Sequence, residues 1–288
     1  MMPSARPRRT ALYLPAHSAR AVEKARSVPC DVVILDLEDA VGPNAKLEAR
    51  PAAVEAVRRG GFGHREVVIR TNGLSTPWGL EDLAAAAQAK PHGVLVPKIA
   101  AASDLRAARA ALGDSVPLWA MIETCAAMLR LHEIGAAGVE TGVEVWVIGS
   151  NDLVKEMRCA HSVQRPGLQT SLSMSVMAAR AFGVAILDGV FNEVSDADGL
   201  ATQCAQGVDL GFDGKTVIHP NQLDITNKAF TPNEAAIAWA RTVISAFDRP
   251  ENAGLGILTV EGRMVERLHY DEARRLIQVA EAIAAVGR

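Results

Sequence analysis

Aromatic residues and cysteines are scarce in this 288-residue sequence. Only 4% of the residues are Phe, Trp or Tyr, the formal net charge is −3, and no basic run carries aromatic side chains that would stack on bases. This composition counts against a nucleic-acid-binding protein. The four cysteines (positions 30, 125, 159 and 204) form no CxxC pair and no metal-ligand spacing, so we expect reduced thiols in a cytoplasmic protein.

Long apolar runs are also missing. The N-terminal segment carries positive charge, but its apolar run before Pro15 is too short for a signal peptide, and no stretch approaches the length that crosses a membrane. We therefore expect no membrane partner. The sequence is nevertheless 49% hydrophobic, which is enough to form a large buried core.

Short apolar runs typical of strands recur eight times, and Ala-rich segments with helical periodicity separate them. This alternation predicts an α/β protein with a (β/α)8 TIM barrel, whose chemistry lies at the C-terminal ends of the strands. A doubly wound open sheet is the alternative, but the GxGxxG fingerprint is absent after the first strand. The predicted strands are Thr10–Ala16, Asp31–Asp39, Glu66–Asn72, Gly93–Ile99, Pro117–Thr124, Glu144–Asp152, Val184–Asn192 and Phe212–Pro220.

The predicted barrel accounts for residues 1–222 and leaves residues 223–288 as a C-terminal extension. We expect a helix over Pro232–Phe247, a short hairpin in the segment ILTV-EGR-MVE, and a final amphipathic helix over Tyr270–Val286. The extension either covers its own barrel or reaches the active site of a neighbouring subunit.

Two predicted neighbouring strands end in carboxylates, Glu123 after LWAMI and Asp152 after VWVIGSN. Because parallel strands end at the same edge of a sheet, we expect the two carboxylates to lie close together. Mg²⁺ is typically held by one or two carboxylates, with water and substrate oxygens completing its shell. The alternative is that Glu123 caps a helix and Asp152 is an N-cap residue.

Most of the remaining predicted strands also end in polar residues. A ring of polar residues at one mouth of a barrel indicates an active site. Lys98 would suit a Schiff-base aldolase, but the metal pair makes that role redundant. We expect the histidines at positions 17, 132, 161, 219 and 269 to be structural or surface residues. The other polar strand-end residues are Tyr13, Asp36, Glu38, Asp39, Arg70, Asn72, Asp188, Asn192, Lys215 and His219.

A series of motifs resembles, in order and along almost the whole chain, the citrate lyase β-subunit-like branch of the HpcH/HpaI aldolase family. That branch includes malyl-CoA, citramalyl-CoA and citryl-CoA lyases. The phrases LWAMIET, LDGVFN and MVERLH are similar to those of malyl-CoA lyases and (3S)-malyl-CoA thioesterases. The motifs are VVILDLEDAVGPNAK, VIRTNGLSTPWG, VLVPK, MIET, IGSNDL, FDGKTVIHPNQ and VEGRMVERLH.

The resemblance implies roles for individual residues. Glu123 and Asp152 would bind Mg²⁺, with Mn²⁺ as a possible substitute, and Asp36, Glu38 and Asp39 would order the metal's waters and nearby loops. Glu266 would be the catalytic acid or base, supplied by an adjacent subunit of a homotrimer or hexamer. Arg70 would stabilise the reacting thioester or carboxylate. The residues implied to contact the substrate or its CoA group are Tyr13, Arg20, Lys24, Arg70, Asn151, Thr216 and Val217.

The sequence departs from the family pattern in three places. Ala16 and His17 replace the usual Gly-Ser or Gly-Asn after the first strand, which alters a place where glycine permits close backbone approach. Cys125 and Ala127 replace the usual residues after the IET motif. Glu266 replaces an Asp, a change that favours the thioesterase-like members.

The resemblance predicts a Mg²⁺-dependent CoA-ester lyase. It would cleave or form the carbon–carbon bond of a β-hydroxyacyl-CoA such as malyl-CoA, with acetyl-CoA and the 2-oxo acid glyoxylate as the other partners. One alternative is a thioesterase that hydrolyses malyl-CoA, because the same carboxylate at position 266 would activate water. Another is a citrate lyase β-type subunit that acts on a carrier-bound citryl ester.

Overall fold

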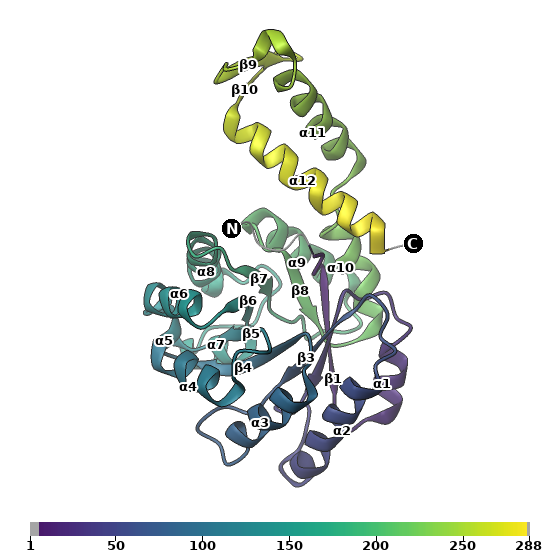
Figure 1. Ribbon diagram of the computed structural model, residues 1–288, viewed down its shortest axis with the longest axis vertical. Coiled ribbons are helices and arrows are strands. Elements are labelled where there is room, and N and C mark those ends of the chain that lie inside the picture. The colour runs from purple at the N-terminus through teal and green to yellow at the C-terminus, as the bar shows by residue number, and fades with distance from the viewer. Residues whose placement is uncertain (1–5, 287–288) are drawn as a thin grey trace. The chain divides into compact units, whose positions relative to one another are not determined.

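The computed structural model describes residues 6–286 and contains a closed barrel of eight parallel strands (Figure 1). Each strand pairs with the next along the chain, and β1 pairs with β8 to close the barrel. The predicted (β/α)8 TIM barrel is confirmed. Its strands are β1 (Thr10–Pro15), β2 (Val32–Asp36), β3 (Glu66–Arg70), β4 (Gly93–Ile99), β5 (Leu118–Ile122), β6 (Val143–Ile148), β7 (Ala185–Asp188) and β8 (Gly214–Val217).

At least one helix follows every strand and packs outside the barrel (Figure 1). These elements are α1 (Ala19–Ala25), η1 (Pro43–Ala45), α2 (Lys46–Arg59), α3 (Gly79–Ala89), α4 (Ala102–Leu112), α5 (Cys125–Met128), α6 (Leu131–Glu140), α7 (Ser150–Met157), η2 (Pro166–Leu168), α8 (Gln169–Ala181), α9 (Ala197–Leu210), η3 (Pro220–Gln222) and α10 (Leu223–Ala229).

The strands are apolar on both faces because each face is covered. Along β2, Val32 and Ile34 belong to the cluster that fills the barrel interior, together with Trp119 from β5. The intervening Val33 and Leu35 belong to the larger cluster between sheet and helices. Side chains on a strand alternate between two faces, so one continuous apolar run serves both layers.

Residues 231–286 form a second compact unit, to which residues 6–7 also belong. It contains α11 (Glu234–Phe247), η4 (Pro250–Asn252), an antiparallel hairpin of β9 (Ile257–Val260) and β10 (Arg263–Glu266), and α12 (Arg267–Val286). Its own apolar core includes Phe247, Val260 and Val265. The helix, hairpin and final helix expected from the sequence are present, although α12 starts at Arg267 rather than Tyr270.

The first unit ends at Phe230, whereas the sequence placed the boundary at residue 222. Helix α10 belongs to the barrel because it is tied to the start of β1. The Thr10 hydroxyl donates to Asn227 Oδ1 at 2.9 Å, and Asn227 Nδ2 donates to the Pro29 carbonyl at 2.6 Å. The apolar pattern of α10 alone carried no sign of these hydrogen bonds.

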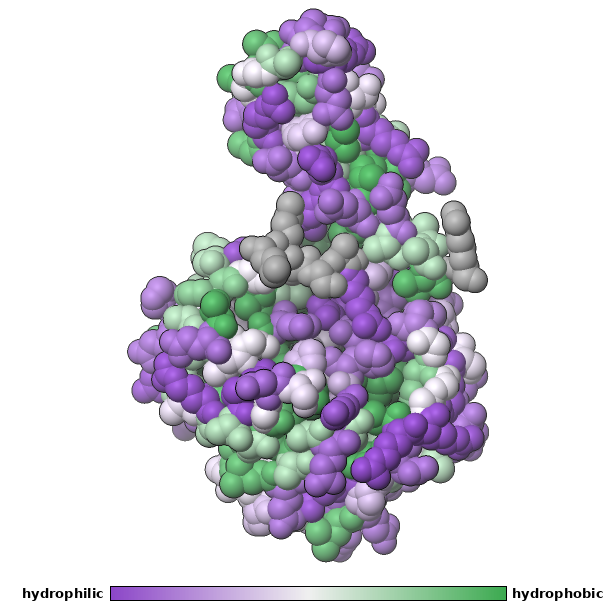
Figure 2. Space-filling model, viewed as in Figure 1, coloured by the Kyte–Doolittle hydropathy of each residue, from purple (hydrophilic) through white to green (hydrophobic). Residues whose placement is uncertain are grey.

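The surface is mixed in polarity. On the face shown in Figure 2, hydrophilic residues are interspersed with hydrophobic ones over both units. This is the pattern expected of helices that bury one stripe and expose the other. Within residues 6–286, no helix combines the length and the apolar character that crossing a bilayer requires.

Candidate active site

Glu123 and Asp152 meet at the C-terminal mouth of the barrel, with the Lys98 ammonium group as their shared cation. Lys98 Nζ pairs with Asp152 Oδ2 and lies 3.6 Å from Glu123 Oε1. The Lys98 backbone N–H also donates to Glu123 Oε1 at 2.7 Å. The structure therefore brings the two predicted metal ligands together around one positive charge.

The capping alternative for these carboxylates is wrong. Thr124 is the N-cap residue of α5, and its side chain accepts from the Ala127 backbone N–H. Gly149 is the N-cap residue of α7, and Asp152 lies within that helix rather than at the end of β6. Glu123, in contrast, directly follows β5 as predicted.

The two carboxylates fit a hard divalent cation, which prefers oxygen ligands and keeps several of its own waters. Glu123 is 1% exposed. Burial raises its pKa to about 7, although Lys98 opposes this rise. Only glycine fits directly after β6 in this arrangement, because a Cβ at position 149 would lie 2.1 Å from Glu123 Oε2. Within the described part of the chain, no cluster of three or more His, Cys, Asp or Glu residues suits a metal, so water or substrate would supply the other ligands.

Lys98 reaches the site because β4 is irregular at its end. The β4–β5 register shifts between Val96 and Ile99, and Lys98 has a left-handed φ of 58°. A bulge of this kind re-aims a side chain next to an active site. Burial lowers the pKa of Lys98, but Glu123 and Asp152 raise it more, so the net pKa lies above its ordinary value. A protonated, ion-paired amine is unsuited to Schiff-base formation.

Arg70 is fixed by carboxylates from the segment that follows β2. Its Nε and Nη2 donate to the two oxygens of Asp36 at 2.6 and 2.5 Å. Its Nη1 lies 3.0 Å from Glu38 Oε2 and donates to Asp39 Oδ2 at 3.2 Å. The guanidinium carbon stands 4.7 Å from the centre of the Tyr13 ring. Burial lowers the pKa of Arg70, but Asp36 more than compensates and holds it well above its ordinary value.

Asp36, Glu38 and Asp39 therefore pair with Arg70, a partner that the sequence did not assign to them. Asp36 also accepts the backbone N–H groups of Glu38 and Ala40 and so holds the start of this loop. Burial raises the pKa of Glu38 to about 8, even though Arg70 lowers it. The role predicted for these carboxylates in holding the metal's waters stays a prediction.

The remaining predicted contacts lie in different environments. Arg20 and Lys24 are exposed, one turn apart on α1. Asn151 and Asn192 exchange two side-chain hydrogen bonds, of 3.2 and 2.9 Å. The side chains of Thr216 and Val217 are buried in β8, so any substrate contact there would use the backbone. Glu266 ends β10 in the second unit.

Several polar strand ends are structural rather than part of one open ring. Asn72 donates to Asp82 Oδ2 at 2.7 Å, which ties β3 to α3. His219 accepts the Asn221 backbone N–H and starts η3, in agreement with its predicted structural role. Asp188 and Lys215 are fully buried and paired with each other. Their third partner, Arg165, could not be predicted from strand ends, because it lies in the segment before η2.

In a comparison with known proteins, residues 9–220 match the model of a family described as HpcH/HpaI aldolase/citrate lyase. A (3S)-malyl-CoA thioesterase from Cereibacter sphaeroides is 45% identical over 99% of both chains. An L-malyl-CoA/beta-methylmalyl-CoA lyase from the same species is 30% identical over 98% of both. The structure of CitE from Mycobacterium tuberculosis in complex with magnesium, acetoacetate and coenzyme A superposes with a TM-score of 0.79 at 27% identity, covering 96% of this chain and 99% of that one.

Proposed function

The chain belongs to the HpcH/HpaI aldolase/citrate lyase family, and we propose that it is a Mg²⁺-dependent enzyme that hydrolyses the thioester of malyl-CoA or a closely similar CoA ester. Family membership confirms the resemblance drawn from the motifs and the prediction of an enzyme of this type. The full-length similarity to (3S)-malyl-CoA thioesterases is the observation that supports hydrolysis most directly.

Carbon–carbon cleavage of the same ester is the second candidate, although the sequence alone placed it first. The similarity to a malyl-CoA lyase supports it, at lower identity. The two reactions differ in their products. Hydrolysis gives malate and free CoA thiol, whereas cleavage gives acetyl-CoA and glyoxylate without a free thiol.

Each part of the site has a task that both reactions share. Glu123 and Asp152 would hold Mg²⁺, which when bound supplies Lewis acidity toward substrate oxygens. Lys98 keeps the two carboxylates in place when they have no other cation. Asp36 occupies one edge of the Arg70 guanidinium and Asp39 accepts from Nη1, so a developing negative charge would reach Nη1 by displacing the exposed Asp39 carboxylate.

Three further residues would complete the proposed site. Arg20 and Lys24, exposed and one turn apart on α1, would attract the phosphates of CoA. Glu266 would move a proton to or from the reacting water or enolate. We propose that it does so in the site of a neighbouring subunit, in a homotrimer or hexamer.

The test is to incubate the purified protein with malyl-, methylmalyl- and citramalyl-CoA, with and without Mg²⁺, and to follow free thiol and released 2-oxo acid separately. We expect Mg²⁺-dependent thiol release without a 2-oxo acid. Release of glyoxylate or pyruvate without thiol would replace hydrolysis by the lyase function. Inactivity on free CoA esters combined with turnover of a carrier-bound citryl ester would favour the citrate lyase β-type alternative.

Matched variants test the metal assignment in the same assay. Glu123→Gln and Asp152→Asn keep the side-chain shape but remove the charge, so activity and Mg²⁺ dependence should be lost together with little change in melting temperature. Glu156→Gln, on the same helix as Asp152, is the control and should stay active. Near-full activity of Asp152→Asn would remove Asp152 from the metal site.

A further inference from the structure

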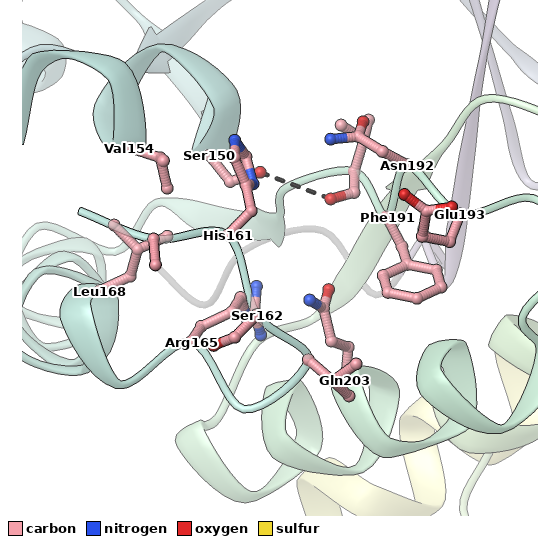
Figure 3. A pocket seen from close by; sticks show the side chains of 13 residues that line it. Ser150, Val154, His161, Ser162, Arg165, Leu168, Phe191, Asn192, Glu193 and Gln203 are labelled. Carbon is pink, nitrogen blue, oxygen red and sulfur yellow. Dashed lines mark hydrogen bonds between the residues drawn. The ribbon is translucent and has the colours of Figure 1, made fainter. Parts of the chain in front are cut away.

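A cavity of about 370 Å³ lies between α7, the segment 158–168, the segment after β7 and the helix α9 (Figure 3). Its volume is in the range typical of small-molecule sites. It is separate from the metal pair. Ser150 and Val154 line the cavity from α7, whereas Asp152 is turned about 200° away from Ser150 around the same helix and pairs with Lys98.

The cavity wall contains a buried guanidinium with an unused donor. Arg165 is 5% exposed. Its Nη1 donates to Asp188 Oδ1 at 2.7 Å and its Nε donates to Gln206 Oε1 at 2.9 Å. Its Nη2 is buried and has no hydrogen-bond partner. Leaving a charged donor unpaired in this way is costly, which points to a missing acceptor.

The charges around Arg165 do not balance. Lys215 Nζ donates to Asp188 Oδ2 at 2.8 Å and to Gln203 Oε1 at 3.2 Å, so one carboxylate serves two cations. Lys215 and Asp188 are both fully buried. Glu193 is the one carboxylate among the described residues that line the cavity, and it is exposed and lies across from Arg165 (Figure 3). A buried excess of one positive charge favours an anionic ligand.

The rest of the lining combines polar side chains, such as His161 and Asn192, with an apolar group that includes Val154, Leu168, Val190 and Phe191. We propose that this cavity binds a small organic monocarboxylate, with its carboxylate at the Arg165 guanidinium and its hydrocarbon chain against these apolar side chains. Inorganic phosphate lacks the hydrocarbon part that this lining would bury. The inference uses no residue of the proposed metal pair and does not rest on the proposed function.

Calorimetry on the full-length protein tests the proposal with acetate, butanoate and hexanoate at constant ionic strength, and with inorganic phosphate in a parallel arm. Affinity should rise by up to about fourfold for each added methylene, because the chain leaves water for an apolar wall. No saturable hexanoate binding would overturn the proposal. Phosphate binding as tight as that of hexanoate would overturn the assignment of an organic carboxylate.

Gln203→Glu places the missing negative charge beside Lys215 in a side chain of the same shape. We expect this variant to fold with an unchanged or higher melting temperature and to lose at least about tenfold in hexanoate affinity. Gln88→Glu adds the same charge to an exposed position of α3 and should bind like the wild type. Asp152→Asn should also bind normally. Undiminished binding in Gln203→Glu, or lost binding in Asp152→Asn, would contradict a separate site at Arg165.

Discussion

At the scale of single residues, Glu123 would exchange one cation for another on binding Mg²⁺. Its carboxylate pairs with Lys98 in this structure, and Mg²⁺ would take the same oxygens. A metal also competes with protons, because only the ionised carboxyl is a ligand. The buried position of Glu123 makes this competition matter near neutral pH.

Mg²⁺ affinity should therefore fall as the solution is acidified below neutrality. Burial raises the pKa of Glu123 to about 7, so the carboxyl is ionised above that pH and increasingly protonated below it. The slope should approach about tenfold in affinity per pH unit. The measurement is the rise in melting temperature with Mg²⁺ concentration, at several values between about pH 6 and pH 8. A constant affinity over this range would show that Glu123 titrates elsewhere or does not bind the metal.

Arg70→Lys tests whether the geometry of the guanidinium matters beyond its charge. Lysine keeps the charge but cannot make the paired hydrogen bonds to Asp36 while it presents a donor on the Nη1 side. Turnover should fall by at least about 100-fold, since small displacements of a positioned group have effects of that size. Steady-state kinetics and the melting temperature are the two readouts.

The matched control is Arg106→Lys, which alters an exposed surface pair with Glu140 and should leave kinetics unchanged. Wild-type kinetics in Arg70→Lys would exclude a role for the planar group in the reaction.

At the scale of elements, the sequence predicts best where one physical rule acts alone. All eight strands were predictable because a short continuous apolar run is typical of a parallel strand that is covered on both faces. Glu123 could be placed from its strand end for the same reason, whereas Asp152 meets it from the first turn of α7. The bulge that turns Lys98 into the site depends on backbone register, which leaves no periodic signal. The hydrogen bond between Arg165 and Asp188 forms because a loop brings Arg165 to the end of β7. No local sequence pattern predicts that contact.

The buried pairing of Asp188 ties the end of β7 to β8 and to the segment 158–168, so Asp188→Asn should destabilise the barrel. Lys215 and Arg165 would keep buried charges without a counterion, which costs roughly 3–5 kcal/mol. Urea denaturation measures the change. The exposed Glu140→Gln, with a surface partner, should change stability by no more than about 1 kcal/mol. Equal midpoints for the two variants would mean that the buried cations need no carboxylate.

The same carboxyl contributes a defined pH dependence of stability. Burial alone would raise the pKa of Asp188, but Lys215 and Arg165 hold it below its ordinary value. A carboxyl whose pKa is lowered on folding adds stability above its unfolded pKa of about 4, and this contribution is lost as the pH falls further. Asp188→Asn should therefore flatten the loss of stability in that acidic range.

At the scale of the whole molecule, the chain consists of two compact units, and the proposed residues are divided between them. The barrel holds Glu123, Asp152 and Arg70, while Glu266 belongs to the second unit, which has its own core. A symmetric oligomer in which each subunit gives one such segment and receives another would complete every site.

Mixing two inactive variants tests this exchange. Glu123→Gln subunits lack the metal ligand, and Glu266→Ala subunits lack the proposed acid or base. If Glu266 acts in a neighbour's site, a mixed oligomer contains sites in which Glu123 comes from one chain and Glu266 from the other. Co-refolding equal amounts should then restore about a quarter of wild-type activity, since half the barrels are intact and half of those receive an intact partner. Wild-type protein refolded alone gives the reference value, and an affinity tag on one variant that co-purifies the untagged other reports whether mixed oligomers form. Mixed oligomers without activity would mean that Glu266 serves its own barrel, because every chain would then carry one defect in its single site. Full activity of Glu266→Ala by itself would exclude this residue and require another group to activate water.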